Sequence, residues 1–168
     1  MIPTATQQLE AMRDTMARFV LPVIPAEERF ATEQANLILA SINWLIDVNE
    51  SQAAYELQEQ ADQHALGEGL LALGLDGLDA TAALKVELAS RPAATATLAE
   101  LREHNQALKA MTAGVLEGAH GGAGAKAVAL FMTAATRQVA REQAYCRMTG
   151  LAKQATGSIE DVLREQSA

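Results

Sequence analysis

The sequence predicts an all-α fold, an antiparallel up-and-down helical bundle of four main helices with short extra helices, in a single domain spanning residues 1–168. Three observations predict it. The length of 168 residues suffices for one hydrophobic core. Apolar residues make up 49% of the chain, aromatic residues only 4%, and 35 residues are alanine, a composition that suits closely packed helices better than pleated sheets. Apolar side chains also recur at spacings of three and four.

The first helix is expected to begin near Thr4 or Thr6, either of which can cap it, and to end at Val20 or Leu21. Its apolar positions follow the helical spacing, and they are Leu9, Met12, Met16, Phe19 and Val20. Pro22 then interrupts the helical pattern, so the helix should end there.

A long second helix is expected to start at Pro25, because proline favours the first helical position and two glutamates follow it. Its apolar arc is wider than a helix needs for one neighbour, so it is expected to contact either two helices inside the chain, or one inside the chain and one from a second subunit. The sequence thus predicts a homodimer, with interface candidates Ile38, Ile42, Leu45 and Ile46.

After the second helix the pattern turns polar and then rich in glycine. Residues 50–64 are largely polar, and residues 67–79 place four glycines between leucines, which is typical of a helix end and an apolar loop. Asp79 can cap a short helix over residues 80–89, and Pro92 separates that helix from the next one.

The third and fourth long helices are expected at about residues 94–117 and 126–155. Asn105 and Thr112 interrupt the aliphatic seam of the third, and Asn105 is a candidate for fixing its register. A glycine-rich connection at residues 118–125 joins the two helices. Ser158 and Asp161 form a cap for a short terminal helix.

Charge is distributed unevenly along the chain. The net charge of −8 argues against nucleic acid as a partner. Residues 30–84 hold nine acidic side chains and no lysine or arginine, whereas the expected fourth helix is basic. The contrast suits either docking between helices or subunits, or two solvated faces that happen to differ. Arg137 and Arg141 lie one turn apart on that helix and are the candidates for holding a small anionic ligand.

Residue types that are used in catalysis and metal binding do not follow a known catalytic or metal-binding pattern in this sequence. One Glu-x-x-His pair occurs, at Glu117 and His120, where a di-iron bundle needs two. Small metalloenzymes of the DinB type use three histidines, two of them one turn apart; here His64, His104 and His120 are scattered, and the sequence leaves open whether they converge. We therefore expect no metal, no cofactor and no catalytic residues.

No stretch of about 18 uncharged apolar residues occurs, so neither a membrane span nor a membrane partner is expected. The first 20 residues carry four charges and do not have the pattern of a signal peptide. The single cysteine, Cys146, cannot form an intramolecular disulfide, and the interpretation of it as a packed thiol is favoured over a reactive one. A cytoplasmic protein is expected.

Two stretches carry a family resemblance. They are Phe19-Val20-Leu21-Pro22-Val23-Ile24-Pro25, followed by Arg29-Phe30 and Asn36-Leu37, and Leu73-Gly74-Leu75-Asp76-Gly77-Leu78-Asp79, followed by Glu87-Leu88-Ala89. Over residues 9–89 the chain resembles an uncharacterised family of small helical bacterial proteins encoded beside acyl-CoA dehydrogenases and phosphotransferase-like proteins. The resemblance implies an accessory role near acyl-CoA or small-acid metabolism and brings no catalytic residues.

The sequence leaves three function classes. The first is a noncatalytic helical bundle that acts through self-association, with a metabolic enzyme as a further protein partner. The second is a bundle that binds a small anionic or acyl ligand. The third, a metal-dependent enzyme, has the least support from the residues present.

Overall fold

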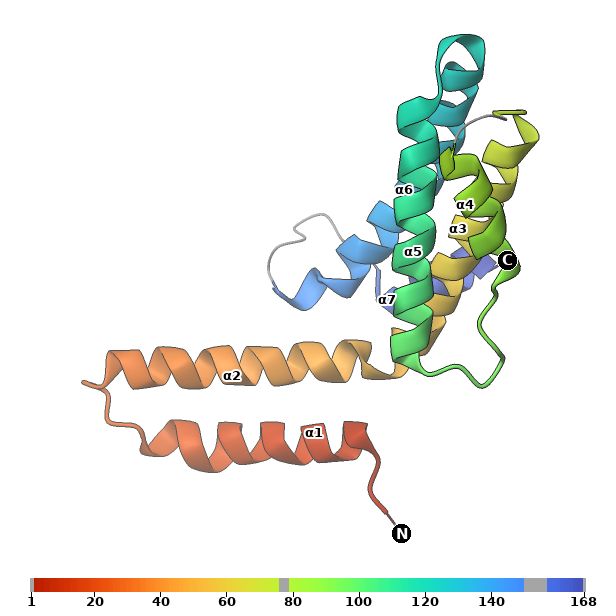
Figure 1. Cartoon of the computed structure of the whole chain (residues 1–168). Helices are drawn as coiled ribbons and strands as arrows, with labels where there is room; N and C mark the ends of the chain where they lie inside the picture. The colour runs from red at the N-terminus through yellow and green to blue at the C-terminus, as the bar shows by residue number, and fades with distance from the viewer. Residues whose placement is uncertain (1, 76–78, 150–156, 168) are drawn as a thin grey trace. The chain divides into compact units, whose positions relative to one another are not determined.

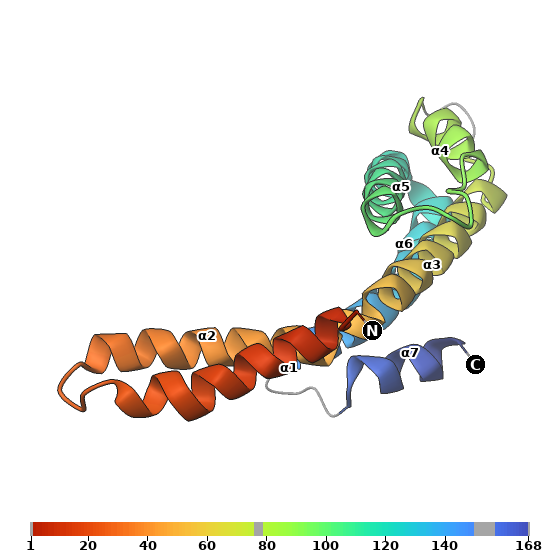
Figure 2. The same cartoon turned by 90° about the horizontal axis from the view of Figure 1, so that it is seen from below.

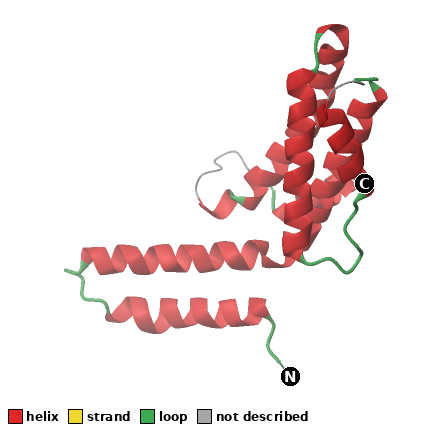
Figure 3. Cartoon of the chain, in the orientation of Figure 1, coloured by secondary structure: helices red, strands yellow, loops and turns green. Residues whose placement is uncertain are grey.

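A computed structural model describes residues 2–75, 79–149 and 157–167. Within those ranges every regular element is helical, as Figure 3 shows, so the predicted all-α fold is confirmed. None of the described helices is both long and apolar enough to cross a membrane.

The chain divides into two compact units, which are described separately. The first unit comprises residues 1–52 and 141–162, and the second comprises residues 53–140 and 163–168. The single domain expected from the sequence stays a prediction.

In the first unit, α1 (Ala5–Thr15) begins at the cap that the sequence predicts. The Thr4 hydroxyl accepts a hydrogen bond from the Gln7 amide at 3.2 Å, and the Gln7 side chain accepts one from the Thr4 amide at 3.0 Å. This reciprocal pair satisfies two backbone donors that the first helical turn leaves open. The chain continues through a π-helical turn, Met16–Val20, and a 3-10 turn, Leu21–Val23, in agreement with the predicted end near Pro22.

The second helix, α2 (Arg29–Val48), begins four residues later than predicted. Pro25 lies in a turn instead, because the Glu28 amide donates to the Pro25 carbonyl and Glu28 has a non-helical ψ of 63°. The two helices form an antiparallel hairpin, visible in Figures 1 and 2. At the other end of the hairpin, the Thr6 hydroxyl donates to Glu50 and accepts from Asn49, which connects the start of α1 to the residues that follow α2.

A segment from later in the chain packs against the C-terminal part of α2 in the same unit. The ring of Trp44 meets that of Tyr145 edge-on, with centroids 5.8 Å apart, and its Nε1 donates to the Tyr145 carbonyl at 2.9 Å. Arg147, in a 3-10 turn (Arg147–Thr149), binds both carboxylate oxygens of Asp47. This hydrogen bonding raises the pKa of the Arg147 guanidinium above its ordinary value.

The polar stretch and the first glycines of the predicted helix end and loop lie in a 21-residue helix, α3 (Gln52–Ala72), so the loop predicted within residues 67–79 begins later than expected. The glycines of α3 serve packing. A Cβ on Gly67 would come within 3.1 Å of Leu88, and one on Gly69 within 3.1 Å of Leu130. The helix ends near Gly74, whose φ of +66° suits glycine at a helix C-terminus.

Three further helices complete most of the second unit. They are α4 (Asp79–Ala89), α5 (Leu98–Gly118) and α6 (Gly121–Tyr145). The predicted helix at residues 80–89 is confirmed, and α5 begins after a Thr97–Glu100 capping box, four residues beyond the predicted start. The buried core contains Leu66, Leu70, Leu84, Leu108, Val115 and Ala127.

The fourth long helix is displaced from its predicted range of 126–155. It starts five residues earlier, because Gly121 takes a φ of +63° and the next glycines wind into the first turn, where Gly124 donates to the His120 carbonyl. It ends at Tyr145, and residues 150–156 lie outside the described part of the chain. The short terminal helix, α7 (Ile159–Ser167), has the predicted cap, with the Asp161 amide donating to the Ser158 hydroxyl.

Candidate functional site

Two of the three histidines meet inside the second unit. His64 of α3 and His104 of α5 place their Nε2 atoms 3.3 Å apart, with the ring centroids 5.5 Å apart. The two side chains are only 4% and 6% exposed. His120 is exposed in the turn between α5 and α6, so it does not join the pair.

A carboxylate extends the pair into a chain of three side chains. Glu87 of α4 places Oε1 at 2.8 Å from Nδ1 of His104. Because a carboxylate can only accept, Nδ1 of His104 is the donor, and Nε2 of a neutral His104 is left to accept from Nε2 of His64. The Glu87–His104–His64 chain therefore joins α4, α5 and α3 through one continuous set of hydrogen bonds.

Burial is the main electrostatic influence on His64. Removal from water lowers the pKa of the His64 imidazole below its ordinary value, the charges of Arg91 and His104 lower it further, and Glu68 opposes them. The neutral form of His64 is therefore favoured in the folded chain.

A cleft of about 490 Å³ lies beside this chain. Its wall includes Glu87, Glu100, Glu103 and His104. Both ring nitrogens of His104 already bind partners, so the arrangement offers the cleft no imidazole nitrogen to act as a general base. Among the described residues, no three metal-ligating side chains lie close enough together to hold a metal ion.

The two arginines proposed as an anion site are one turn apart on α6, as expected. Arg137 donates through Nε to Asp62 at 3.0 Å and through a terminal nitrogen to the Gln166 carbonyl at 2.9 Å. Arg141 is fully buried. An anion binding there would have to compete with Asp62, so the ligand site stays a prediction that this pairing disfavours.

The acidic run and the basic helix are connected by ion pairs within the chain. Asp62 binds Arg137 of α6 in the second unit, and Asp47 binds Arg147 in the first. Helix α5 supplies two more cations to α3, in the pairs Lys109–Glu59 at 2.8 Å and Arg102–Glu56 at 3.0 Å. The charge contrast seen in the sequence thus serves helix pairing inside each unit.

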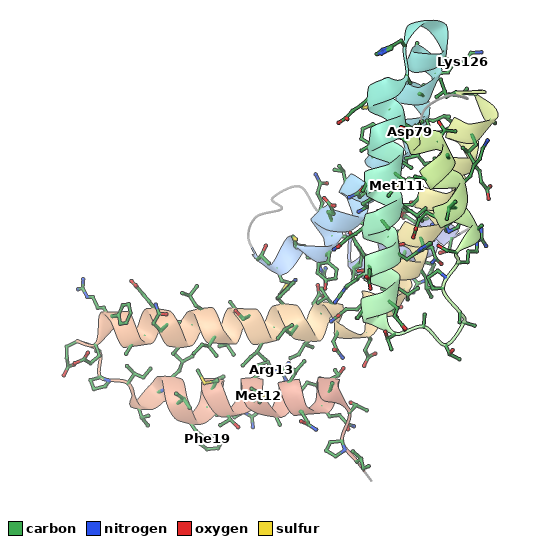
Figure 4. The ribbon with its side chains drawn as sticks, in the orientation of Figure 1. Met12, Arg13, Phe19, Asp79, Met111 and Lys126 are labelled. Carbon is green, nitrogen blue, oxygen red and sulfur yellow. The ribbon has the colours of Figure 1, made fainter. Side chains whose placement is uncertain are left out.

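The hairpin of the first unit leaves seven large apolar side chains exposed, which together we call the hairpin surface. Its side chains are between 37% and 74% exposed, and they are Met12, Phe19, Val20, Val23, Phe30, Leu37 and Ile38. In Figure 4, Phe19 lies on the side of α1 that faces away from α2. Spacings of seven from Met12 to Phe19 and from Phe30 to Leu37 were the sequence signal for this surface.

The predicted dimer residues divide between this surface and the interior. Ile38 is 51% exposed, whereas Ile42 is 4% exposed and therefore packs within its own chain. Leu45 and Ile46 are partly buried. The dimer contact stays a prediction. The sequence analysis did not single out the exposed phenylalanines, because periodicity alone does not show which apolar side an intrachain neighbour covers.

No family model, curated protein or solved structure matches this chain. The resemblance over residues 9–89, and the accessory role that it implies, therefore stay predictions.

Proposed function

We propose that the protein functions through self-association, with the hairpin surface of one copy packing against that of a second copy. The observation that supports this most strongly is the small interior of the hairpin. Helix α1 has no buried residue, and α2 buries only Ala35, Ile42 and Val48. Two amphipathic helices with so little core gain stability when two more helices cover their remaining apolar faces.

The hydrophobic effect supplies the driving force. Fully burying a side chain of this class contributes about 1.5–3 kcal/mol, and the hairpin surface offers seven such side chains that are already part-exposed on each copy. Each of these side chains is already partly buried and contributes a fraction of that value, so the gain summed over two copies is on the same scale as the estimated cost of association, about 4–15 kcal/mol.

Self-association is one part of the role expected from the sequence. The family resemblance supports an accessory function beside an enzyme of acyl-CoA or small-acid metabolism, with the dimer as the form that binds this enzyme. The single cysteine supports placing this function in the cytoplasm.

The test is the mass in solution of the wild-type protein and matched variants, measured by light scattering across micromolar concentrations. We expect a dimer for the wild type and a monomer for Phe19→Glu and Leu37→Glu, because each substitution would place a charge in an apolar contact. Val86→Glu is the control, since Val86 is 71% exposed but lies on α4 in the second unit. It should remain dimeric.

Two outcomes contradict the proposal. A wild-type monomer at every concentration removes self-association. A dimer that survives both hairpin substitutions but is lost in Met132→Glu assigns the contact to α6 instead, where Met132 is 56% exposed.

A further inference from the structure

We propose that the Glu87–His104–His64 chain is an acid-sensitive contact that holds α3, α4 and α5 together while the histidine pair carries at most one extra proton, and that releases them when both imidazoles are protonated. This inference concerns the second unit and is independent of the proposed self-association.

The geometry allows a single proton between the two rings. At 3.3 Å, one Nε2 atom must donate and the other must accept. A neutral pair satisfies this, and so does a pair with one added proton, since the charged ring donates to the neutral one. When both rings are charged, two N–H groups face each other, the hydrogen bond is lost and two positive charges lie in contact.

The contact matters because of where it lies. Each of its three side chains comes from a different helix, and both histidines are almost completely buried. A doubly charged pair can therefore reach water only if the helices move apart. Glu87 is bonded to His104 alone of the two rings, so loss of the His64–His104 bond removes a buried link between α3 and the α4–α5 pair and weakens their packing.

The charged groups around the pair divide in their effect. On α3, Glu68 favours a proton on His64, and after α4, Arg91 opposes it. On α4, Glu87 accepts from His104, and on α5, Glu100 and Glu103 line the cleft next to His104.

The direction of the pH dependence follows from linkage. The pKa of His64 is lower in the folded chain than its ordinary value of 6.5, with burial as the largest cause. Well above that value neither state binds the extra proton at His64, so stability does not depend on the pH through this group. As the pH falls below it, the unfolded chain binds more protons, and stability decreases until the pH reaches the folded value.

The experiment measures urea unfolding of the wild type, His64→Gln and His120→Gln at several pH values between about 8 and 5. Glutamine at position 64 can still donate to Nε2 of His104 but cannot take up a proton. We expect the unfolding constant of the wild type to rise with acidification, by at most about tenfold per pH unit for one linked proton, relative to His64→Gln. His120→Gln changes an exposed histidine and should follow the wild type.

A second measurement needs no variant. Backbone hydrogen exchange of the wild type, corrected for the intrinsic effect of pH, should show faster opening of α3 around His64, of α4 and of the first turns of α5 on acidification. The first unit should not change in the same way. Equal pH dependence in wild type and His64→Gln, or an NMR titration in which the His64 ring gains its proton at or above pH 6.5, overturns the inference.

Discussion

Single side chains in this protein connect segments that are far apart in sequence. Arg147 and Asp47 are 100 residues apart, and the guanidinium binds both carboxylate oxygens. The two side chains are 33% and 16% exposed, so water screens the pair only in part. A partly buried ion pair of this kind contributes more to the free energy of unfolding than a fully exposed pair does.

We therefore expect Arg147→Met to lower the free energy of unfolding by about 1–3 kcal/mol, because Asp47 would be left partly buried without its cation. Chemical denaturation measures the loss. Arg18→Met is the matched control, since Arg18 is 73% exposed in its pair with Asp14, and its effect should stay within about 0.5 kcal/mol. Equal losses for both variants would contradict the assignment.

At the scale of helices, capping residues and glycines determine where each helix begins and ends. The cap of α5 consists of the Thr97 hydroxyl, which accepts from the Glu100 amide, and the Glu100 carboxylate, which accepts from the Thr97 amide at 2.7 Å. The bond to the Thr97 backbone is the main reason that the pKa of Glu100 is lowered.

Thr97→Ala should destabilise the protein by about 1 kcal/mol, because the hydroxyl satisfies an amide of the first turn. Glu100 also makes the stability depend on pH, but here the charged form of the side chain is the one that the folded chain favours. Its contribution is present above the ordinary carboxyl pKa of 4.5 and is lost as the pH falls through the lower folded value. Thermal melts of Thr97→Ala and wild type at neutral pH and near pH 4 check both effects; an unchanged melting temperature at neutral pH would contradict the role of the cap.

Two glycines with different backbone angles should respond oppositely to alanine. Gly74 has a φ of +66°, so Gly74→Ala should cost about 1–2 kcal/mol even though nothing lies within 4 Å of the new Cβ. Gly122, in the first turn of α6, has the same open surroundings without a positive φ. Gly122→Ala should add about 0.4–1 kcal/mol by restricting the unfolded chain. Melting temperatures that move in the same direction would contradict this account.

For the whole molecule, the exposed apolar side chains of the first unit dominate the expected behaviour. If the hairpin surface is buried between two copies, folding is coupled to association, and mass action makes the melting temperature rise with protein concentration. We expect this rise for the wild type and for Val86→Glu. Phe19→Glu should melt at a temperature that is independent of concentration, and a concentration dependence that persists in it would contradict the role of the hairpin.

Much of the fold could be predicted from short stretches of sequence. The caps at Thr4 and Ser158 and the helix at residues 80–89 depend on residues within about one turn of each other, so composition and spacing are enough to find them. The exception is α3. Its glycines suggest a loop by their intrinsic preference, and only the tertiary structure shows that the side chains of Leu88 and Leu130 pack closely against positions 67 and 69.

The candidate site depended on tertiary structure. The sequence by itself determined an all-α chain with a wide apolar arc on its second helix, because periodicity and capping are local properties. The tertiary structure decided that His64 lies against His104, 40 residues away, that His120 does not, and that Arg137 binds Asp62. It also decided which apolar residues α1 and α2 leave exposed. These pairings follow from the packing of helices on one another. The immediate sequence neighbours of a side chain do not predict that packing.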